Sequence, residues 1–223
     1  MATDEAQLEA AHRGIASLRF YTWHPATLSL GYFQSHRVRF ADADLAALPF
    51  VRRPSGGLTL VHDRELTYAL ALPAGKAWGT HDGPGWLCRM HGIIGLALRQ
   101  LGVCVDRVDC AGFASQDDIL CFRHHTPGDL LLDGYKITGS AQRRQRGALL
   151  QHGAVLLAAS RYATTLPGIA DLAGKQIAPS ELAQAIAQQW QQQISWLLEV
   201  ADPLDVPHRL VEKYRSSAWN EKR

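Results

Sequence analysis

The chain has 223 residues, of which 47% are apolar and 20% charged, a composition typical of a globular protein with a sizeable core. A net charge of +2 gives no reason to expect nucleic acid or an acidic membrane as a partner, although arginines are concentrated at residues 52–53 and 143–146. The chain starts without a secretory signal, and no apolar run approaches the roughly 18 residues needed to cross a bilayer. We therefore expect a cytoplasmic protein with no membrane contact.

Helical and strand patterns alternate along the chain. In chain order the predicted elements are a helix at 4–16, strands at 18–23 and 27–32, a helix at 38–48, strands at 50–53, 58–61 and 66–72, a helix at 86–101, strands at 103–108, 119–123, 129–132, 135–138 and 148–157, and helices at 179–199 and 210–214. Asp133-Gly134 is a strong hairpin signal. Runs of strands with helices between and after them predict an α+β domain on a mixed, largely antiparallel sheet.

The segment Arg52-Arg53-Pro54-Ser55-Gly56-Gly57 is a candidate ligand loop. A Gly-Gly pair lets backbone N–H groups approach a ligand closely, and two arginines offer charge-assisted bonds to a phosphate or carboxylate. The segment matches neither of the common glycine-rich nucleotide motifs. From these residues alone, a tight turn with exposed arginines is as good an interpretation as an anion site.

Lys136 lies just after the predicted hairpin turn and before Gly139-Ser140-Ala141. The small neighbours leave room for a ligand carbonyl or phosphate, and an ammonium there would stabilise developing negative charge. A lone lysine on a strand more often lies on the solvent face of an alternating hairpin. Spacing alone favours that second interpretation.

Cys121 precedes Phe122 and lies close to two histidines in the sequence. A thiolate is a competent acyl-transfer nucleophile when a cation or a histidine lowers its pKa, but free cysteines are more often small core residues.

His62 and His152 both adjoin turn-like residues and are candidates to line a pocket, although single histidines are more often structural. No two histidines share i, i+4 spacing on a convincing helix, so we predict no metal site.

Two stretches of the sequence together resemble one family. They are RRPSGGLTLVHDRELTYAL and, about seventy residues later, DGYKITGSAQRRQRGALLQHGAVLL, and they are similar to the signature of the lipoate–protein ligase, octanoyltransferase and biotin ligase superfamily. The opening MATDEA, the stretch LRFYTWHPATLSLGYFQ and Lys213-Tyr214 with Trp219-Asn220 also fit, so the resemblance covers most of the chain. It implies a biotin/lipoyl protein ligase-like fold and a tunnel for a medium acyl chain beside Lys136.

Within the superfamily, the chain is most similar to the cysteine-dependent octanoyltransferases. It lacks the Gly-Arg-Gly-Arg type loop of biotin ligases, and Leu58 stands where many lipoate ligases have a third glycine. Cys121-Phe122, 15 residues before Lys136, matches the transferase arrangement, although the following RHHTPGDL departs from the family's Pro-Ser-Tyr-Glu-like run. We expect one catalytic domain over residues 1–223, with no C-terminal accessory domain.

The resemblance implies an acyltransferase that moves octanoyl from acyl carrier protein to the lysine of a lipoyl domain, such as the glycine cleavage H protein. It implies catalysis by Cys121 and Lys136, with no cofactor, metal or nucleic acid. The remaining expected substrate-binding residues are Arg52, Arg53, Ser55, Gly56, Gly57, His62, Gly139, Ser140, Ala141, Gln142, His152 and Gly153.

Two alternatives remain open. One is an ATP-dependent lipoate–protein ligase, which would use ATP and Mg²⁺ to form lipoyl-AMP. The other is a non-catalytic protein that binds an acyl chain. The long loop at residues 73–85 is a candidate lid over the substrate because of its length and glycines.

Overall fold

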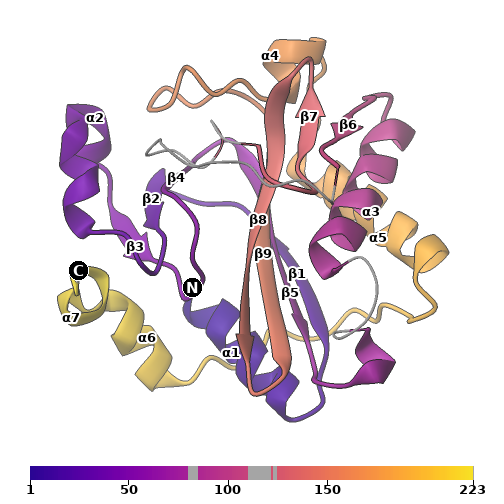
Figure 1. The fold of residues 1–223 in the computed structure, drawn as a ribbon, viewed down its shortest axis with the longest axis horizontal. Helices are drawn as coiled ribbons and strands as arrows, with labels where there is room; N and C mark the ends of the chain where they lie inside the picture. The colour runs from indigo at the N-terminus through magenta and orange to yellow at the C-terminus, as the bar shows by residue number, and fades with distance from the viewer. Residues whose placement is uncertain (80–84, 110–121, 123–124, 223) are drawn as a thin grey trace.

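The computed structural model describes residues 1–79, 85–109, 122 and 125–222, and these residues contain two sheets (Figure 1). In spatial order the larger sheet consists of β1 (Ser17–Tyr21), β5 (Glu65–Leu72), β9 (Ala148–Leu156), β8 (Tyr135–Gln145), β7 (Leu130–Leu132) and β6 (Asp106–Arg107). The smaller sheet consists of β3 (Phe50–Arg52), β2 (Thr27–Leu30) and β4 (Leu60–His62). All pairs in the larger sheet are antiparallel, whereas β2 and β3 are parallel, which confirms the predicted mixed α+β fold.

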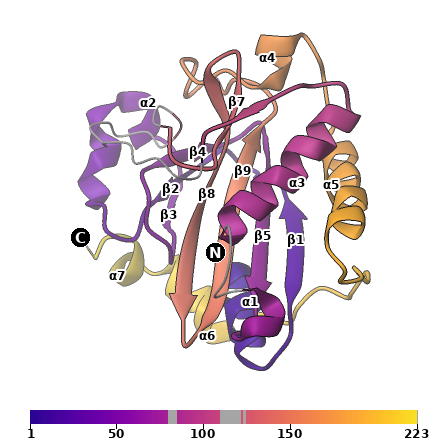
Figure 2. The same cartoon turned by 45° about the vertical axis from the view of Figure 1, so that its right-hand side comes forward.

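Helices cover both faces of the larger sheet. The helical elements are α1 (Ala2–His12), α2 (Ala43–Ala46), α3 (Trp86–Gln100), α4 (Ile169–Ala173), α5 (Pro179–Gln193), α6 (His208–Arg215), α7 (Ser217–Asn220) and the 3-10 turns η1 (His36–Ala41) and η2 (Lys76–Trp78). The helices α3 and α5 pack together over one face, as Figure 2 shows, and α1 packs on the opposite face through Leu8 and Ala11. None of the described helices is long and apolar enough to span a bilayer.

The central strands β5 and β9 position the candidate site. Every residue of both strands is buried, as expected for central strands that are covered on both faces. Their apolar residues on one face join the main core under α3 and α5. The antiparallel register places His152 opposite both Ala69 and Ala141, so these three side chains share the other face, which is the face that α1 covers.

Most predicted elements are present, with different bounds. The predicted helix at 38–48 is wrong as a single helix, because Asp42 caps a new helix through its side chain and separates η1 from α2. The strand predicted at 135–138 continues to Gln145, since β9 pairs with it over that length. Helices α4 and α7 were not predicted. Of the strand predicted at 119–123, only Phe122 belongs to the described residues.

Candidate active site

The loop between β3 and β4 carries the Arg-Arg-Pro-Ser-Gly-Gly segment and is held by its own arginines. Arg53 donates from Nη1 to the Ser29 carbonyl and hydroxyl at 2.8 and 2.7 Å, and from Nη2 to the Leu58 carbonyl at 2.7 Å. A Cβ on Gly31 would lie 1.8 Å from the Gly57 carbonyl oxygen, so only glycine lets the loop cross β2 so closely. Arg53 therefore braces the loop that it belongs to.

Arg52 is buried and binds the end of the chain. Its Nε and Nη2 donate to the Asn220 carbonyl at 3.2 and 2.9 Å, and its Nη1 donates to the Gln34 carbonyl at 2.6 Å. The Asn220 side chain in turn accepts the Arg52 backbone N–H at 2.9 Å. These hydrogen bonds tie the loop to α7, and they show Arg52 as a structural brace in this state of the protein.

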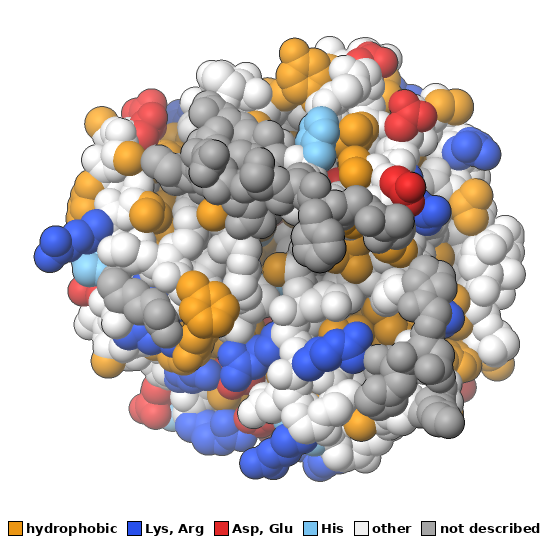
Figure 3. All heavy atoms as spheres, viewed as in Figure 1, with side chains coloured by type: hydrophobic (Ala, Val, Ile, Leu, Met, Phe, Trp, Pro, Cys, Tyr) orange, Lys and Arg blue, Asp and Glu red, His pale blue; other side chains and the backbone are white. Residues whose placement is uncertain are grey.

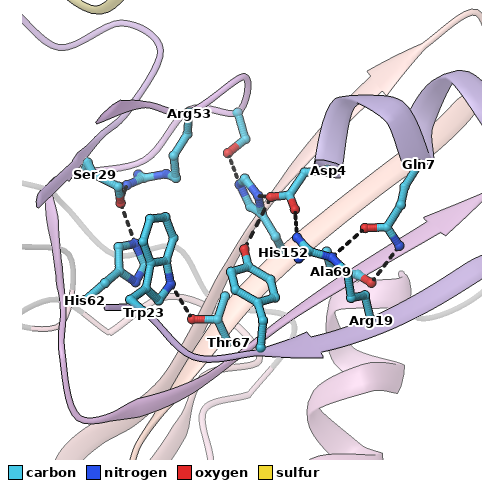
Figure 4. Close-up of polar contacts among 12 residues, drawn as sticks. Asp4, Gln7, Arg19, Trp23, Ser29, Arg53, His62, Thr67, Ala69 and His152 are labelled. Carbon is cyan, nitrogen blue, oxygen red and sulfur yellow. Dashed lines mark hydrogen bonds and ion pairs between the residues drawn. The ribbon is translucent and has the colours of Figure 1, made fainter. Parts of the chain in front are cut away.

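His62 lies in a buried chain between the Ser29 hydroxyl and the Glu65 carboxylate, and Figure 4 shows its bond to Ser29. The Ser29 hydroxyl accepts from Arg53 Nη1 and lies 2.7 Å from His62 Nε2. His62 Nδ1 is hydrogen-bonded to Glu65, and the ring stacks on Trp23 with centroids 4.2 Å apart. The orientation of His62 is therefore fixed.

His152 forms a second chain of the same kind, with Ser55 and Asp4. The Ser55 hydroxyl lies 2.5 Å from Nε2, and Nδ1 lies 2.9 Å from Asp4 Oδ2 (Figure 4). Burial lowers the pKa of His152, although its bond to Asp4 opposes the shift. Burial alone would raise the pKa of Asp4, but the Met1 amino group, His152 and Arg19 hold it well below its usual value. His152 is thus neutral beside an ionised Asp4.

Lys136 is buried on β8 and pairs with Asp129. Its Nζ lies 2.6 Å from Asp129 Oδ2 and 5.5 Å from the centre of the Phe122 ring. A Cβ on Gly139 would lie 2.5 Å from Lys136 Cε and 3.0 Å from Nζ, so the lysine side chain occupies the space that any other residue at 139 would fill. The interpretation of Lys136 as a solvent-facing strand lysine is therefore wrong, since only 4% of the residue is exposed.

A cavity of about 40 Å³ is lined by both histidines and by Gly139, against which the Lys136 side chain lies. Its wall includes eight of the predicted site residues, which are Arg53, Gly57, His62, Gly139, Ser140, Ala141, His152 and Gly153. The described residues thus outline a cavity in the place where the resemblance implies the tunnel for an acyl chain.

Other predicted residues lie behind the cavity wall or away from it. Ser55 reaches the cavity only through His152, Gly56 packs under the Phe33 ring, and Gln142 bonds to Gln151. Cys121 lies outside the described residues, as do residues 80–84 of the predicted lid. The described residues contain no group of His, Cys, Asp or Glu that would hold a metal ion.

Sequence reasoning missed the carboxylates of the site. Asp4, Glu65 and Asp129 are each at most 2% exposed, and each binds a predicted site residue. The only sequence signal is an acidic residue within or beside an apolar run, as for Asp129 before Leu130-Leu131-Leu132.

A larger hollow of about 850 Å³ against α3 contains none of the predicted site residues. The smaller cavity is the candidate site because the buried ionisable groups converge on it.

A buried lysine close to a small cavity is an arrangement that can stabilise a negative carbonyl or acyl-phosphate oxygen. Comparison with known proteins gives the family. Residues 1–202 match the lipoyl protein ligase A/B catalytic domain, and the chain belongs to this family.

The most similar relatives include proteins named octanoyltransferase LipM. The one from Kyrpidia tusciae is 32% identical over 99% of this chain and 93% of its own length. The one from Bacillus subtilis is 29% identical over 100% of this chain and 93% of its own. The crystal structure of a lipoate-protein ligase A bound with ATP shares the fold, with a TM-score of 0.73, 19% identity and coverage of 99% of this chain and 92% of that one. This protein is an acyltransferase.

The contact between Gly139 and Lys136 gives a first prediction. In Gly139→Ala the new methyl group displaces the lysine from Asp129, so we expect stability to fall by about 1–3 kcal/mol and acyl transfer to fail. Urea unfolding and an activity assay measure the two effects. Gly85→Ala is the matched control, because a Cβ at Gly85 meets no atom of the described residues within 4 Å. Equal stability of the two variants would contradict the prediction.

His91 on α3 gives a second prediction, about pH. Its Nδ1 lies 2.7 Å from the Gly128 carbonyl and its Nε2 lies 2.8 Å from the Ser140 hydroxyl. Burial lowers the pKa of His91 from 6.5 to about 4, because it disfavours the charged ring. Between these two pH values the unfolded chain binds a proton that the folded chain does not, so stability falls as the pH falls.

The expected loss from this one ring is on the order of 3 kcal/mol across that range. Urea unfolding at a series of pH values measures it. The amide of His91→Gln can replace both hydrogen bonds but does not titrate. In this variant the dependence of the unfolding free energy on pH should therefore be weaker and come mainly from His152, whose pKa is also lowered. An unchanged slope would exclude His91 as the titrating group.

Proposed function

We propose that this protein transfers an octanoyl group from acyl carrier protein to the lysine of a lipoyl domain, such as the glycine cleavage H protein. The observation that carries the proposal is the likeness, over nearly the whole chain, to relatives named octanoyltransferase LipM. The buried lysine beside a cavity in the same domain supports it. The reaction requires neither a metal nor a cofactor.

The proposed nucleophile is Cys121. Its thiolate attacks the octanoyl thioester, the bond to the carrier's sulfur breaks, and the acyl group becomes a thioester of the enzyme. Phe122, the next residue, lines the cavity within 5.5 Å of Lys136 Nζ, which supports this role. The lysine amine of the acceptor then attacks the acyl carbon, and the cysteine leaves.

Lys136 is the proposed electrostatic catalyst. Both tetrahedral intermediates carry a negative oxygen, and a nearby ammonium stabilises it. The pairing with Asp129 holds the ammonium in place before the substrate arrives, so little reorganisation is needed during the reaction. His62 and His152 are proposed as rigid walls of the acyl site, because their hydrogen-bonded partners immobilise both rings.

The proposed partner surface lies near the arginines at 143–146. In Figure 3, Lys and Arg side chains gather over the lower half of the visible face, where the β8–β9 hairpin lies in Figure 1. Arg143 is anchored by a 2.8 Å hydrogen bond to the Pro54 carbonyl, so it connects this surface to the site loop. A cationic surface there suits an acidic carrier domain.

A third prediction tests the cysteine. After mixing with octanoyl-carrier protein and no ATP, the wild-type protein should gain one octanoyl mass in intact-protein mass spectrometry, and Cys121→Ser should not. Cys104→Ser is the matched control, because Cys104 is a free, exposed thiol. This variant should gain the octanoyl mass as the wild type does. No adduct on any of the three proteins would favour the ATP-dependent ligase, with the acyl-binding protein next.

A fourth prediction tests the lysine. Lys136→Ala should slow octanoyl transfer roughly 10²–10³-fold, the usual cost of losing one donor to an oxyanion. Because the change leaves Asp129 without its cation, stability also falls, so the rate is taken per folded molecule from circular dichroism. The neighbouring Tyr135 is half exposed, and Tyr135→Ala should retain the wild-type rate. A rate for Lys136→Ala within a few-fold of wild type would exclude this role.

A further inference from the structure

The carboxylate of Asp129 has one crowded oxygen and one oxygen without a partner. Oδ2 accepts from the Thr126 backbone N–H at 2.6 Å, from the Thr126 hydroxyl at 2.9 Å and from Lys136 Nζ at 2.6 Å. Oδ1 is buried and accepts no hydrogen bond in the described part of the chain. The asymmetry is notable because the residue as a whole has no exposed surface.

The unpartnered oxygen lies beside Gly139, a residue that lines the candidate cavity. A Cβ on Gly139 would lie 3.7 Å from Asp129 Oδ1 and 3.0 Å from Lys136 Nζ, so both groups lie against the bare backbone of Gly139. Gly139 itself lines the cavity, and so does Phe122, the aromatic neighbour of the lysine. Asp129 Oδ1 therefore adjoins the site with no side chain of residue 139 between them.

A buried carboxylate oxygen without a partner costs about 1–3 kcal/mol or more, so proteins seldom retain one without a use. An ionised carboxylate only accepts hydrogen bonds and an ammonium only donates them. The pair thus places a hydrogen-bond donor beside a hydrogen-bond acceptor. Lys136 can donate to a ligand carbonyl oxygen, and Asp129 can accept from a ligand N–H group. Glu65 Oε2 is also without a partner among the described residues, but no lysine or arginine pairs with Glu65 there.

We propose that Asp129 Oδ1 binds the amine of the incoming acceptor lysine and orients it toward the acyl carbon beside Lys136. This inference rests on the proposed function. In the step that it assists, the amine nitrogen bonds to the acyl carbon and the carbon–sulfur bond breaks. Of the two protons that the acceptor ammonium loses, one goes to the departing thiolate and one to water. Asp129 remains a hydrogen-bond acceptor throughout.

Asp129→Asn tests the proposal sharply. Lys136 and Thr126 require an acceptor at the Oδ2 position, so the amide oxygen of Asn takes that place and its NH₂ takes the place of Oδ1. The variant keeps a hydrogen-bond partner for Lys136. At the Oδ1 position it presents an N–H donor, whereas the amine of the lipoyl-domain lysine needs a hydrogen-bond acceptor there. Because Asp129 also holds the Lys136 ammonium, octanoyl-enzyme formation slows in this variant too, and its rate is the reference for the second half-reaction. Transfer of the octanoyl group to a lipoyl domain should slow by a further factor of about 10 to 100, as expected for one charged hydrogen bond.

Two controls separate this role from a structural one. Thr126→Val removes one donor to Oδ2 and leaves Oδ1 intact, so it should not change the ratio of the two half-reaction rates. Hydroxylamine is neutral at neutral pH and needs no binding site for a cation. Relative to the rate of octanoyl-enzyme formation, it should therefore discharge the octanoyl-enzyme of wild type and Asp129→Asn equally fast. Equal slowing of both half-reactions, or no slowing, would overturn the proposal.

A binding measurement keeps this test independent of the proposed function. The dissociation constant is measured for a lipoyl domain with its target lysine and for one in which methionine replaces that lysine. Wild type should prefer the lysine form at least 10-fold, and Asp129→Asn should not. If wild type shows no such preference, the inference is wrong whatever reaction the enzyme performs. If the preference is present but no octanoyl-enzyme forms, only the proposed function fails.

Discussion

The pairing of Lys136 with Asp129 is the constraint on which the candidate site depends. A buried ammonium needs a buried anion, and the β7–β8 hairpin supplies both, with Asp129 at its entrance and Lys136 just beyond the turn. The remaining features accommodate this pair. Gly139 leaves space for the lysine side chain, and Phe122 covers its ammonium. A buried ion pair contributes little net stability, so its presence beside a cavity indicates chemistry in preference to folding.

The two histidine chains restrain the opposite side of the cavity. In each, a serine hydroxyl and a carboxylate bind the two ring nitrogens, so neither ring can turn without breaking a buried hydrogen bond. The chains use different parts of the fold, since His62 belongs to the smaller sheet and His152 to the larger one. The cavity thus lies at the junction of the two sheets, and both histidine rings in its wall are held in place.

The sequence predicts the local structure better than it predicts the site. Alternating apolar residues and the Asp133-Gly134 turn are local signals, and they correctly indicate β5, β9 and the hairpin. The partners of the functional residues are distant in sequence, as with Asp4 and His152, which lie 148 positions apart. No periodicity encodes such a contact. The motif resemblance, together with the loop and hairpin residues that carry it, indicated the cavity wall, but not the carboxylates behind it.

The bond between Arg52 and Asn220 affects the order in which the protein assembles. These residues are 168 positions apart, and Asn220 accepts both the backbone and the guanidinium hydrogens of Arg52. Contacts of such long range form late, because loop-closure entropy opposes them until most of the chain is folded. The loop that begins at Arg52 can therefore reach this arrangement only after residue 220 has left the ribosome.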